Sequence, residues 1–277
     1  MAFNESRNTK NPSSFRKKFF VIIVMLLLLL SITSLMKLNV FSHKAKASQK
    51  TQVISVSKIN LTTTKKPLIT TYNGKTQKVV YLTFDDGVSP KYEKEILNIL
   101  EKNNIKATFF VIGSTLKEHP QYIKNLLQMG EYVGMHSMTH DYKHLYIEGQ
   151  YTEEMLQEQK ILKGITGKTI HLTRPPYGSK PGITLEERNQ LAAAGLKMWD
   201  WTIDSYDWNL PHNPKQIINN VLKHAKANVE VVLMHEKKQT VEALPSIING
   251  LKAKGYTFKV YNEDQHFPLN FWHDGRL

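Results

Sequence analysis

Residues 78–87 read KVVYLTFDDG, an apolar run that ends in two acids and a glycine. Lys78–Phe84 is rich in residues that favour strands and is short enough to be one buried strand. Two adjacent carboxylates, Asp85 and Asp86, follow it and are in turn followed by Gly87. Carboxylates beside a buried strand are costly unless a partner neutralises them. An aspartate–glycine turn would explain the sequence locally, whereas a metal ligand beside a general base would explain it chemically.

The rest of the chain alternates short apolar runs with segments of helical spacing. The apolar runs predict strands at residues 78–84, 107–112, 132–136, 172–173, 197–202, 229–234 and 257–260. Helices are predicted between them at residues 92–102, 119–129, 152–163, 184–194, 214–224 and 241–254. About seven strands separated by helices favour an α/β fold with a parallel sheet, either closed into a barrel or open and doubly wound.

Two of these helices carry recognisable start signals. Thr152 is in position to cap the helix at 152–163, whose first turn also holds acids that favour a helix N-terminus. Thr184 and Glu187 have capping-box spacing at the start of the helix at 184–194, and Gly195 marks its end.

Unusual polar residues follow five of the predicted strands. The five clusters read TFDDG at 83–87, HSMTH at 136–140, RPPYG at 174–178, DSYDW at 204–208 and LMHE at 233–236. In a parallel barrel the active site forms at the carboxyl ends of the strands, so these clusters are expected to lie close together. No glycine-rich phosphate-binding motif follows the first strand, which weakens a nucleotide-binding interpretation.

The residue types in the first three clusters suit hydrolysis. His136 and His140, four residues apart, can meet one cation from a tight loop, and Asp86 would complete a two-histidine, one-carboxylate site. Such a site leaves open positions for water and substrate. Arg174 stands on a loop stiffened by two prolines and can orient a carboxylate, while the Tyr177 peptide N–H can hold an oxyanion.

The last two clusters supply an imidazole and its surroundings. A carboxylate beside Trp208 can orient a catalytic imidazole, and the indole can form one wall of an apolar slot. His235, at the end of a strand, can protonate a leaving group. Each cluster taken alone also has an ordinary explanation as a turn, an incidental pair of histidines or a half-buried ring.

Together, the five motifs resemble those of the polysaccharide deacetylases, carbohydrate esterase family four. TFDDG, HSMTH, RPPYG, DSYDW and LMH carry the resemblance, which extends over about residues 76–265. It implies a distorted (β/α) barrel with fewer than eight regular units, and hydrolysis of acetyl groups from a glycan. Two positions depart from the usual family pattern: Val88 stands in place of proline, and Glu236 stands where aspartate is common.

The resemblance also implies roles for the residues of the first three motifs. Asp85 would be the general base, and Arg174 would pair with it and position it. Asp86, His136 and His140 would bind a divalent metal, usually zinc, with cobalt as an alternative.

The remaining roles concern the oxyanion, the leaving group and the pocket. The backbone N–H of Tyr177 would help to stabilise the oxyanion. Asp207 would orient His235, the general acid that protonates the departing amine. Trp208 and Leu233 would shape the pocket for the acetyl methyl group.

The N-terminus carries a membrane signal. Residues 19–36 form an uncharged apolar run, about the minimum length for a helix that spans a bilayer, and basic residues directly before it place the N-terminus in the cytoplasm. The alternative is a signal peptide cleaved near Ala47. We therefore expect a basic cytoplasmic segment at 1–18, an anchor or signal core at 19–36, a polar linker at 37–75 and an extracytoplasmic catalytic domain at 76–277.

The net charge of +13 does not indicate nucleic-acid binding. Residues 1–75 hold thirteen basic residues and one acid, whereas the remaining 202 residues hold 24 basic and 23 acidic ones. A domain that reads DNA would have its own positive surface, so no nucleic-acid partner is expected. The chain has no cysteine, which excludes disulfides, thiolate metal sites and cysteine nucleophiles.

The expected location of the catalytic domain indicates which substrate it meets. A domain tethered outside a membrane meets cell-wall glycan first, so the favoured substrate is N-acetylglucosamine in the glycan strands of peptidoglycan. Deacetylation of chitin oligomers or O-acetylated xylan requires the same chemistry. Two other classes stay open, namely a non-catalytic glycan-binding domain and a metal-dependent nuclease. The protein is expected to act as a monomer.

Overall fold

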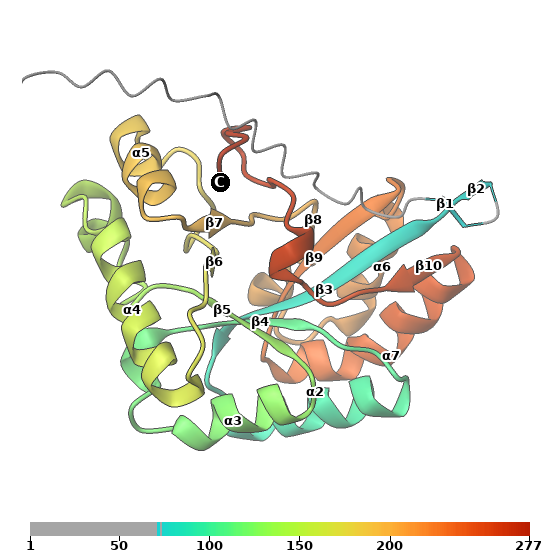
Figure 1. Ribbon diagram of the computed structural model, residues 1–277. Helices are drawn as coiled ribbons and strands as arrows, with labels where there is room; N and C mark the ends of the chain where they lie inside the picture. The colour runs from blue at the N-terminus through green and yellow to red at the C-terminus, as the bar shows by residue number, and fades with distance from the viewer. Residues whose placement is uncertain (1–70, 73) are drawn as a thin grey trace, which may run out of the picture. The chain divides into compact units, whose positions relative to one another are not determined.

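The computed structural model describes residues 71–72 and 74–277, which are drawn as coloured ribbon in Figure 1. The predicted segments at 1–18 and 19–36, and nearly all of the 37–75 linker, lie outside the described residues. In the part of the chain that is described, no helix is long and apolar enough to cross a membrane.

Eight parallel strands form the frame of the domain, and each pairs in parallel with its neighbours. They are β3 (Lys78–Gly87), β4 (Thr108–Val111), β5 (Tyr132–Met135), β6 (Leu172–Thr173), β7 (Lys197–Met198), β8 (Ile203–Asp204), β9 (Val229–His235) and β10 (Tyr256–Phe258). A short antiparallel pair, β1 (Thr71–Tyr72) and β2 (Lys75–Thr76), precedes them.

Helices connect most of the strands. They are α2 (Pro90–Lys102), α3 (Pro120–Gln128), α4 (Tyr151–Thr166), α5 (Leu185–Ala193), α6 (Pro214–His224) and α7 (Lys238–Ala253). Four short helical segments lie in the loops: η1 (Gly113–Thr115), the π-helical η2 (Lys143–Ile147), η3 (Asp207–Asn209) and η4 (Glu263–Gln265).

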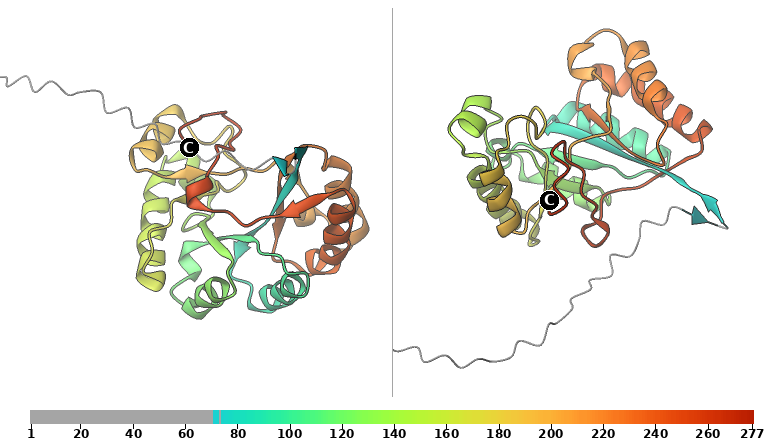
Figure 2. Two further views of the ribbon diagram at one scale, coloured as in Figure 1. Left: turned by 45° about the vertical axis from the view of Figure 1, so that its right-hand side comes forward. Right: turned by 90° about the horizontal axis from the view of Figure 1, so that it is seen from above.

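The predicted distorted barrel is present as a half-barrel. Seven strands form a curved sheet in the order β7-β6-β5-β4-β3-β9-β8, and β10 pairs with the first part of β3. The helices follow one another around the outer side of this sheet (Figure 2, left). Within the described residues, the end strands β7 and β8 do not pair with each other.

The central strand β3 separates two apolar clusters. Val80, Leu82 and Phe84 belong to the larger cluster, which packs the sheet against the helices. Val79 and Tyr81 belong to a smaller cluster on the inner side, together with Trp199 and Tyr261 from other segments. Side chains along a strand alternate between its faces, so the inner face of β3 continues to Thr83 and Asp85. The alternation therefore directs Asp85 into the half-barrel.

The predicted strand at 197–202 is wrong beyond its first two residues. The strand β7 ends at Met198, and Trp199 instead forms a parallel bridge with Leu269 of the C-terminal segment. The Asp200 N–H then donates to the Leu269 carbonyl oxygen at 2.6 Å. A distant part of the chain thus takes over the pairing, and the separate strand β8 starts only at Ile203.

The two predicted helix starts had different outcomes. Thr184 accepts a hydrogen bond from the Glu187 N–H at 3.2 Å, and Glu187 accepts one from the Thr184 N–H at 2.8 Å, which confirms the capping box of α5. The predicted cap at Thr152 is wrong, because α4 begins one residue earlier and Gln150 occupies the cap position. Thr152 is buried within the first turn.

Asp200 ties the C-terminal segment to the loop before α5. Its buried carboxylate accepts hydrogen bonds from the N–H of Ser179 at 2.8 Å, the hydroxyl of Ser179 at 2.6 Å and the N–H of Phe271 at 2.6 Å. Its backbone carbonyl accepts from Arg174 Nη2 at 3.0 Å. Asp200 therefore fixes three segments around one buried arginine.

We expect Asp200→Ala to lower the free energy of unfolding by about 2–4 kcal/mol, because the buried Ser179 and the half-buried Phe271 N–H lose their hydrogen bonds to this carboxylate. Urea unfolding followed by tryptophan fluorescence measures the change. The control is Asp264→Ala, which removes an exposed carboxylate from η4. Equal stability of the two variants would contradict the structural role of Asp200.

Candidate active site

An irregularity at the end of β3 directs two neighbouring aspartates into the same pocket. Along a regular strand Asp85 and Asp86 would point to opposite faces. The register with β4 shifts between Phe84 and Gly87, where β3 holds one residue more than its neighbour. Asp86 also adopts a left-handed backbone conformation, with φ at 66°. The strand thus continues through both carboxylates, beyond its predicted end, and the bulge turns Asp86 inward.

A buried arginine holds Asp85. Arg174 Nη1 donates to Asp85 Oδ1 at 2.9 Å and to Thr83 Oγ1 at 2.6 Å. The guanidinium also donates to two backbone carbonyl oxygens and lies 4.1 Å from the centre of the Phe110 ring. These contacts fix one oxygen of Asp85. The other oxygen, Oδ2, lies 3.7 Å from Nε2 of His136.

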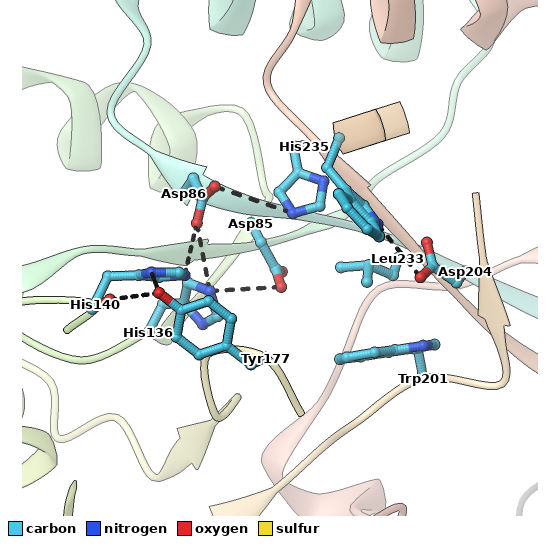
Figure 3. Close-up of a pocket in the computed structure, with 10 residues that line it drawn as sticks. Asp85, Asp86, His136, His140, Tyr177, Trp201, Asp204, Leu233 and His235 are labelled. Carbon is cyan, nitrogen blue, oxygen red and sulfur yellow. Dashed lines mark hydrogen bonds and ion pairs between the residues drawn. The ribbon is translucent and has the colours of Figure 1, made fainter. Parts of the chain in front are cut away.

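Asp86, His136 and His140 form a candidate metal site (Figure 3). Their ligand atoms lie within 4.8 Å of one another, and Asp86 Oδ1 is 3.5 Å from Nε2 of His136 and 3.3 Å from Nε2 of His140. His136 Nδ1 is 2.8 Å from the Arg174 carbonyl oxygen, so Nδ1 carries the proton and Nε2 keeps its lone pair. The Tyr177 hydroxyl donates to the His140 carbonyl at 3.0 Å and accepts from His140 Nδ1 at 3.1 Å.

This donor set fits a divalent cation. Asp86 Oδ1 is buried and has no hydrogen-bond partner among the described residues. Burial and the neighbouring His136 lower the pKa of His140, which keeps its imidazole neutral and able to bind a metal. Burial raises the pKa of Asp86, but three nearby imidazoles outweigh it, so the pKa lies below its ordinary value. Two imidazoles and a carboxylate suit a metal that keeps open coordination positions.

Two glutamates of α4 hold the loop that carries both histidines. Glu158 accepts a hydrogen bond from the His136 N–H at 3.1 Å. Glu154 accepts from the N–H groups of Met138 at 2.8 Å and Thr139 at 3.0 Å, and from the Thr139 hydroxyl at 2.8 Å. Their i, i+4 spacing places the two carboxylates on one face of the helix. Sequence reasoning missed the role of Glu154, because acids in the first turn of a helix are expected on general grounds.

Asp207 holds His235 from behind. Asp207 Oδ1 is 2.7 Å from His235 Nδ1, and Oδ2 accepts from the His235 N–H at 2.7 Å and the Thr240 hydroxyl at 2.5 Å. The other ring nitrogen, Nε2, lies 4.0 Å from Asp86 Oδ2. Burial lowers the pKa of His235, but the hydrogen bond and charge of Asp207, with the charges of Asp85 and Asp86, raise the pKa above its ordinary value.

These groups surround one pocket of about 400 Å³. Eight predicted site residues line it: Asp85, Asp86, His136, His140, Tyr177, Trp208, Leu233 and His235. The other two, Arg174 and Asp207, lie behind it and contact Asp85 and His235. Trp201 and Asp204 also line the pocket, and sequence reasoning assigned neither of them a role. In Figure 3, His136, His140 and Tyr177 lie on one side of the pocket. Leu233 and Asp204 lie on the other side.

Glu236, one of the two departures from the family pattern, has a structural position beneath the site. It is buried, accepts a hydrogen bond from the Tyr122 hydroxyl and accepts another from the Ser89 N–H at 3.0 Å. Burial raises the pKa of Glu236 to about 8. A Cβ at Gly87 would lie 2.6 Å from the Tyr122 hydroxyl oxygen, so the glycine of the first motif makes room for this contact. Glu236 directly follows His235 and thereby connects the end of β9 to the loop after β3.

We expect Glu154→Ala to weaken zinc binding by about tenfold, because the loop between His136 and His140 loses the acceptor for three hydrogen bonds. Competition with a fluorescent chelator measures the affinity. Glu153→Ala, which changes an exposed acid in the same helical turn, is the matched control. Equal zinc affinity in the two variants would show that Glu154 does not shape the site.

Comparisons with known proteins agree with this arrangement. The family model for polysaccharide deacetylases matches residues 72–199. The chain is 50% identical over 212 residues to a peptidoglycan-N-acetylglucosamine deacetylase of Bacillus cereus, covering 74% of this chain and 77% of that protein.

Solved structures agree as well. A crystal structure of a polysaccharide deacetylase from Bacillus cereus matches with a TM-score of 0.71 and 50% identity, over 73% of this chain and all of that one. A CE4 family pseudoenzyme from Bacillus anthracis matches with a TM-score of 0.61 and 27% identity, over 69% and 66% of the two chains. The motifs, the half-barrel and these similarities lead to one conclusion: the chain belongs to the polysaccharide deacetylase family.

Proposed function

We propose that this protein is a metal-dependent deacetylase that removes N-acetyl groups from cell-wall glycan, with N-acetylglucosamine of peptidoglycan as substrate. One observation carries the proposal: a candidate metal triad, an arginine-held carboxylate and an aspartate-held histidine surround a single pocket. The similarity to a protein named peptidoglycan-N-acetylglucosamine deacetylase supports the choice of substrate.

The metal we propose is zinc, held by Asp86, His136 and His140, with cobalt as a functional substitute. Nitrogen and oxygen ligands with an open coordination position are typical of catalytic zinc sites. Such a cation supplies Lewis acidity, which polarises a carbonyl oxygen and lowers the pKa of water.

The side chains around the site support acid–base roles for Asp85 and His235. With one oxygen held by Arg174, Asp85 has its other oxygen available to take a proton from the attacking water. The water oxygen bonds to the acetyl carbon, and the Tyr177 N–H would stabilise the oxyanion that develops. His235 then gives a proton to the amide nitrogen as the carbon–nitrogen bond breaks, which releases acetate and a free sugar amine. Asp207 keeps the imidazole oriented for this transfer.

The apolar wall of the pocket suits the acetyl group. Leu233 and Trp208 line the pocket together with the reactive groups, as does Trp201. Apolar side chains there would surround the methyl group and keep bulk water away from the amide.

The family also contains a non-catalytic member, so the fold alone does not establish activity. The Bacillus anthracis protein with this fold is called a pseudoenzyme. In this chain every position that we assign to the reaction holds a side chain able to perform it, which favours the enzyme over a glycan-binding domain. The near-neutral charge of residues 76–277 argues against the nuclease alternative.

Acetate release tests the reaction and its substrate. We expect the zinc-loaded protein to release acetate from peptidoglycan faster than from chitin oligomers or acetylated xylan. Asp85→Asn should retain the metal but lose about 10²–10⁴-fold in turnover, since it lacks the proton acceptor. His140→Ala should lose both metal and turnover. Metal content measured beside acetate release separates the two effects.

Three results would contradict the proposal. Full activity of Asp85→Asn would remove the assigned base. No acetate from any of the three glycans, with zinc or cobalt supplied, would favour the non-catalytic alternative. Nicking of plasmid DNA that a chelator abolishes would instead point to a nuclease.

We also propose that the domain lies outside the cell membrane and is anchored by residues 19–36. The support is the uncharged length of this segment and the basic residues directly before it. Mass spectrometry of the protein from its native membrane fraction should then find peptides from residues 1–18. A mature N-terminus next to Ala47, with the protein in the medium, would show a cleaved signal peptide instead.

A further inference from the structure

One peptide group beside the pocket is held by two side chains to which the proposed reaction assigns no role. It joins Pro176 to Tyr177 in the loop between β6 and α5, and it carries the N–H that we assign to the oxyanion. Among the described residues the one cis peptide bond is Lys180–Pro181, so this group is trans. The carbonyl and the N–H of a trans peptide group share one plane and point in opposite directions. A contact that fixes the Pro176 carbonyl therefore also fixes the direction of the Tyr177 N–H.

Tyr146 fixes this carbonyl. Its hydroxyl donates to the Pro176 carbonyl oxygen at 2.6 Å, and the side chain is buried. Burial raises the pKa of Tyr146, so the hydroxyl keeps its proton and remains a donor at neutral pH. A hydrogen bond to a peptide carbonyl also polarises the group, which makes its N–H a stronger donor. Tyr146 thus acts on both the direction and the strength of the proposed oxyanion donor.

The ring of Tyr146 is packed closely enough to hold the hydroxyl in place. A Cβ added at Gly182, which lies in the same loop as Tyr177, would be 2.7 Å from Tyr146 Cγ, so the ring and the loop backbone are in close contact. The ring centre is also 5.2 Å from that of Tyr142 and 6.1 Å from that of Tyr151. These neighbours leave the hydroxyl a fixed position against the loop.

Phe271 packs on the residue that follows Tyr177. A Cβ added at Gly178 would be 2.9 Å from Phe271 Cε2 and 3.2 Å from Trp201 Cη2, so only a glycine fits beside these two rings. Tyr177 has φ at 64° and Gly178 has φ at 87°, and two successive left-handed residues turn the chain sharply. An unfavourable backbone such as that of Tyr177 persists only where its surroundings determine it. Phe271 is part of those surroundings.

Phe271 is itself held from outside the pocket. Its N–H donates to Asp200 Oδ2 at 2.6 Å and lies 3.2 Å from the Ser179 hydroxyl oxygen. The indole of the next residue, Trp272, donates to the Ser179 carbonyl oxygen at 2.9 Å. The Phe271 ring meets the Trp201 ring edge to face, with centres 5.1 Å apart and planes at 83°. Trp201 lines the pocket and Phe271 does not, so Phe271 supports the pocket from behind.

We propose that Tyr146 and Phe271 are positioning residues, which hold the Tyr177 N–H where the oxyanion of the deacetylation develops. This inference rests on the proposed function. Neither side chain lines the pocket, so both would act through the peptide group and not through the substrate. A donor stabilises an oxyanion only when it points at the place that the oxygen occupies in the transition state. A small rotation of this peptide should therefore slow the reaction without weakening substrate binding.

Tyr146→Phe tests the contact with the carbonyl, because it removes one oxygen atom and keeps the ring. With the zinc-loaded full chain and a β-1,4-linked N-acetylglucosamine pentamer, we expect kcat to fall about tenfold and KM to change by less than about twofold. The pH dependence of kcat/KM and the zinc affinity should not change, because Asp85, His235 and the metal ligands are intact. The matched control is Tyr256→Phe in β10, which removes a hydroxyl that donates to the Ala227 carbonyl at 2.7 Å.

Phe271→Ala tests the packing on Gly178. We expect kcat for the pentamer to fall about 10–100-fold, with KM and zinc affinity kept, because the turn is free to move. Phe271→Leu, which restores most of the apolar volume, should recover most of the lost kcat. Phe258→Ala is the control for general damage, since it truncates another half-buried phenylalanine, in β10. If Phe271→Ala does not fold, Tyr146→Phe decides the question.

A measurement without turnover keeps this inference distinct from the proposed function. In protein labelled with ¹⁵N-tyrosine, the Tyr177 amide resonance is assigned by its absence in Tyr177→Phe. Tyr146→Phe and Phe271→Ala should shift this resonance, and Tyr256→Phe should leave it in place. A shift with no acetate released by any variant would support the two contacts and reject the deacetylase. Acetate release with unchanged kcat in both variants, or equal losses in the controls, would overturn the positioning roles.

Discussion

The site depends on two consecutive aspartates of one strand facing the same pocket. Asp85 follows the inward side of β3, as the alternation of a strand requires. Asp86 faces the same way only because the register with β4 slips there and its φ is 66°. Without that slip, Asp86 would point toward the helices, and His136 and His140 would lose the one carboxylate oxygen that lies within 3.5 Å of both. The bulge at the end of β3 therefore places the proposed metal ligand Asp86 beside the proposed base Asp85.

Strained backbone is concentrated in the polar motifs at the strand ends. Seven described residues other than glycine have positive φ, and five of them belong to these motifs: Asp86, Ser137, His140, Tyr177 and Tyr206. Each such conformation is unfavourable by itself and persists only where the surroundings determine it. Here the surroundings include carboxylates that accept hydrogen bonds from the strained loops. Glu154 holds the loop between the histidines, and Asp204 holds the turn at Tyr206. Polar contacts around the site thus stabilise a geometry that apolar packing alone would not select.

The sequence predicted the parts of the site better than their arrangement. Apolar periodicity located most strands, and the polar clusters after them contain most of the side chains that line the pocket. The capping box of α5 was predictable because it is a local interaction. The strand expected at 197–202 failed because its partner, Leu269, lies far away in the chain. The contact of Glu154 with the loop between the histidines could not be predicted either, since a glutamate in the first turn is ordinarily explained as an exposed helix-start residue.

The most direct test of the account is anomalous diffraction at the zinc absorption edge from crystals of the zinc-loaded protein. We expect one strong peak within about 2.0–2.2 Å of Asp86 Oδ1, His136 Nε2 and His140 Nε2. Zinc bound elsewhere, with these three side chains carrying no peak between them, would contradict it.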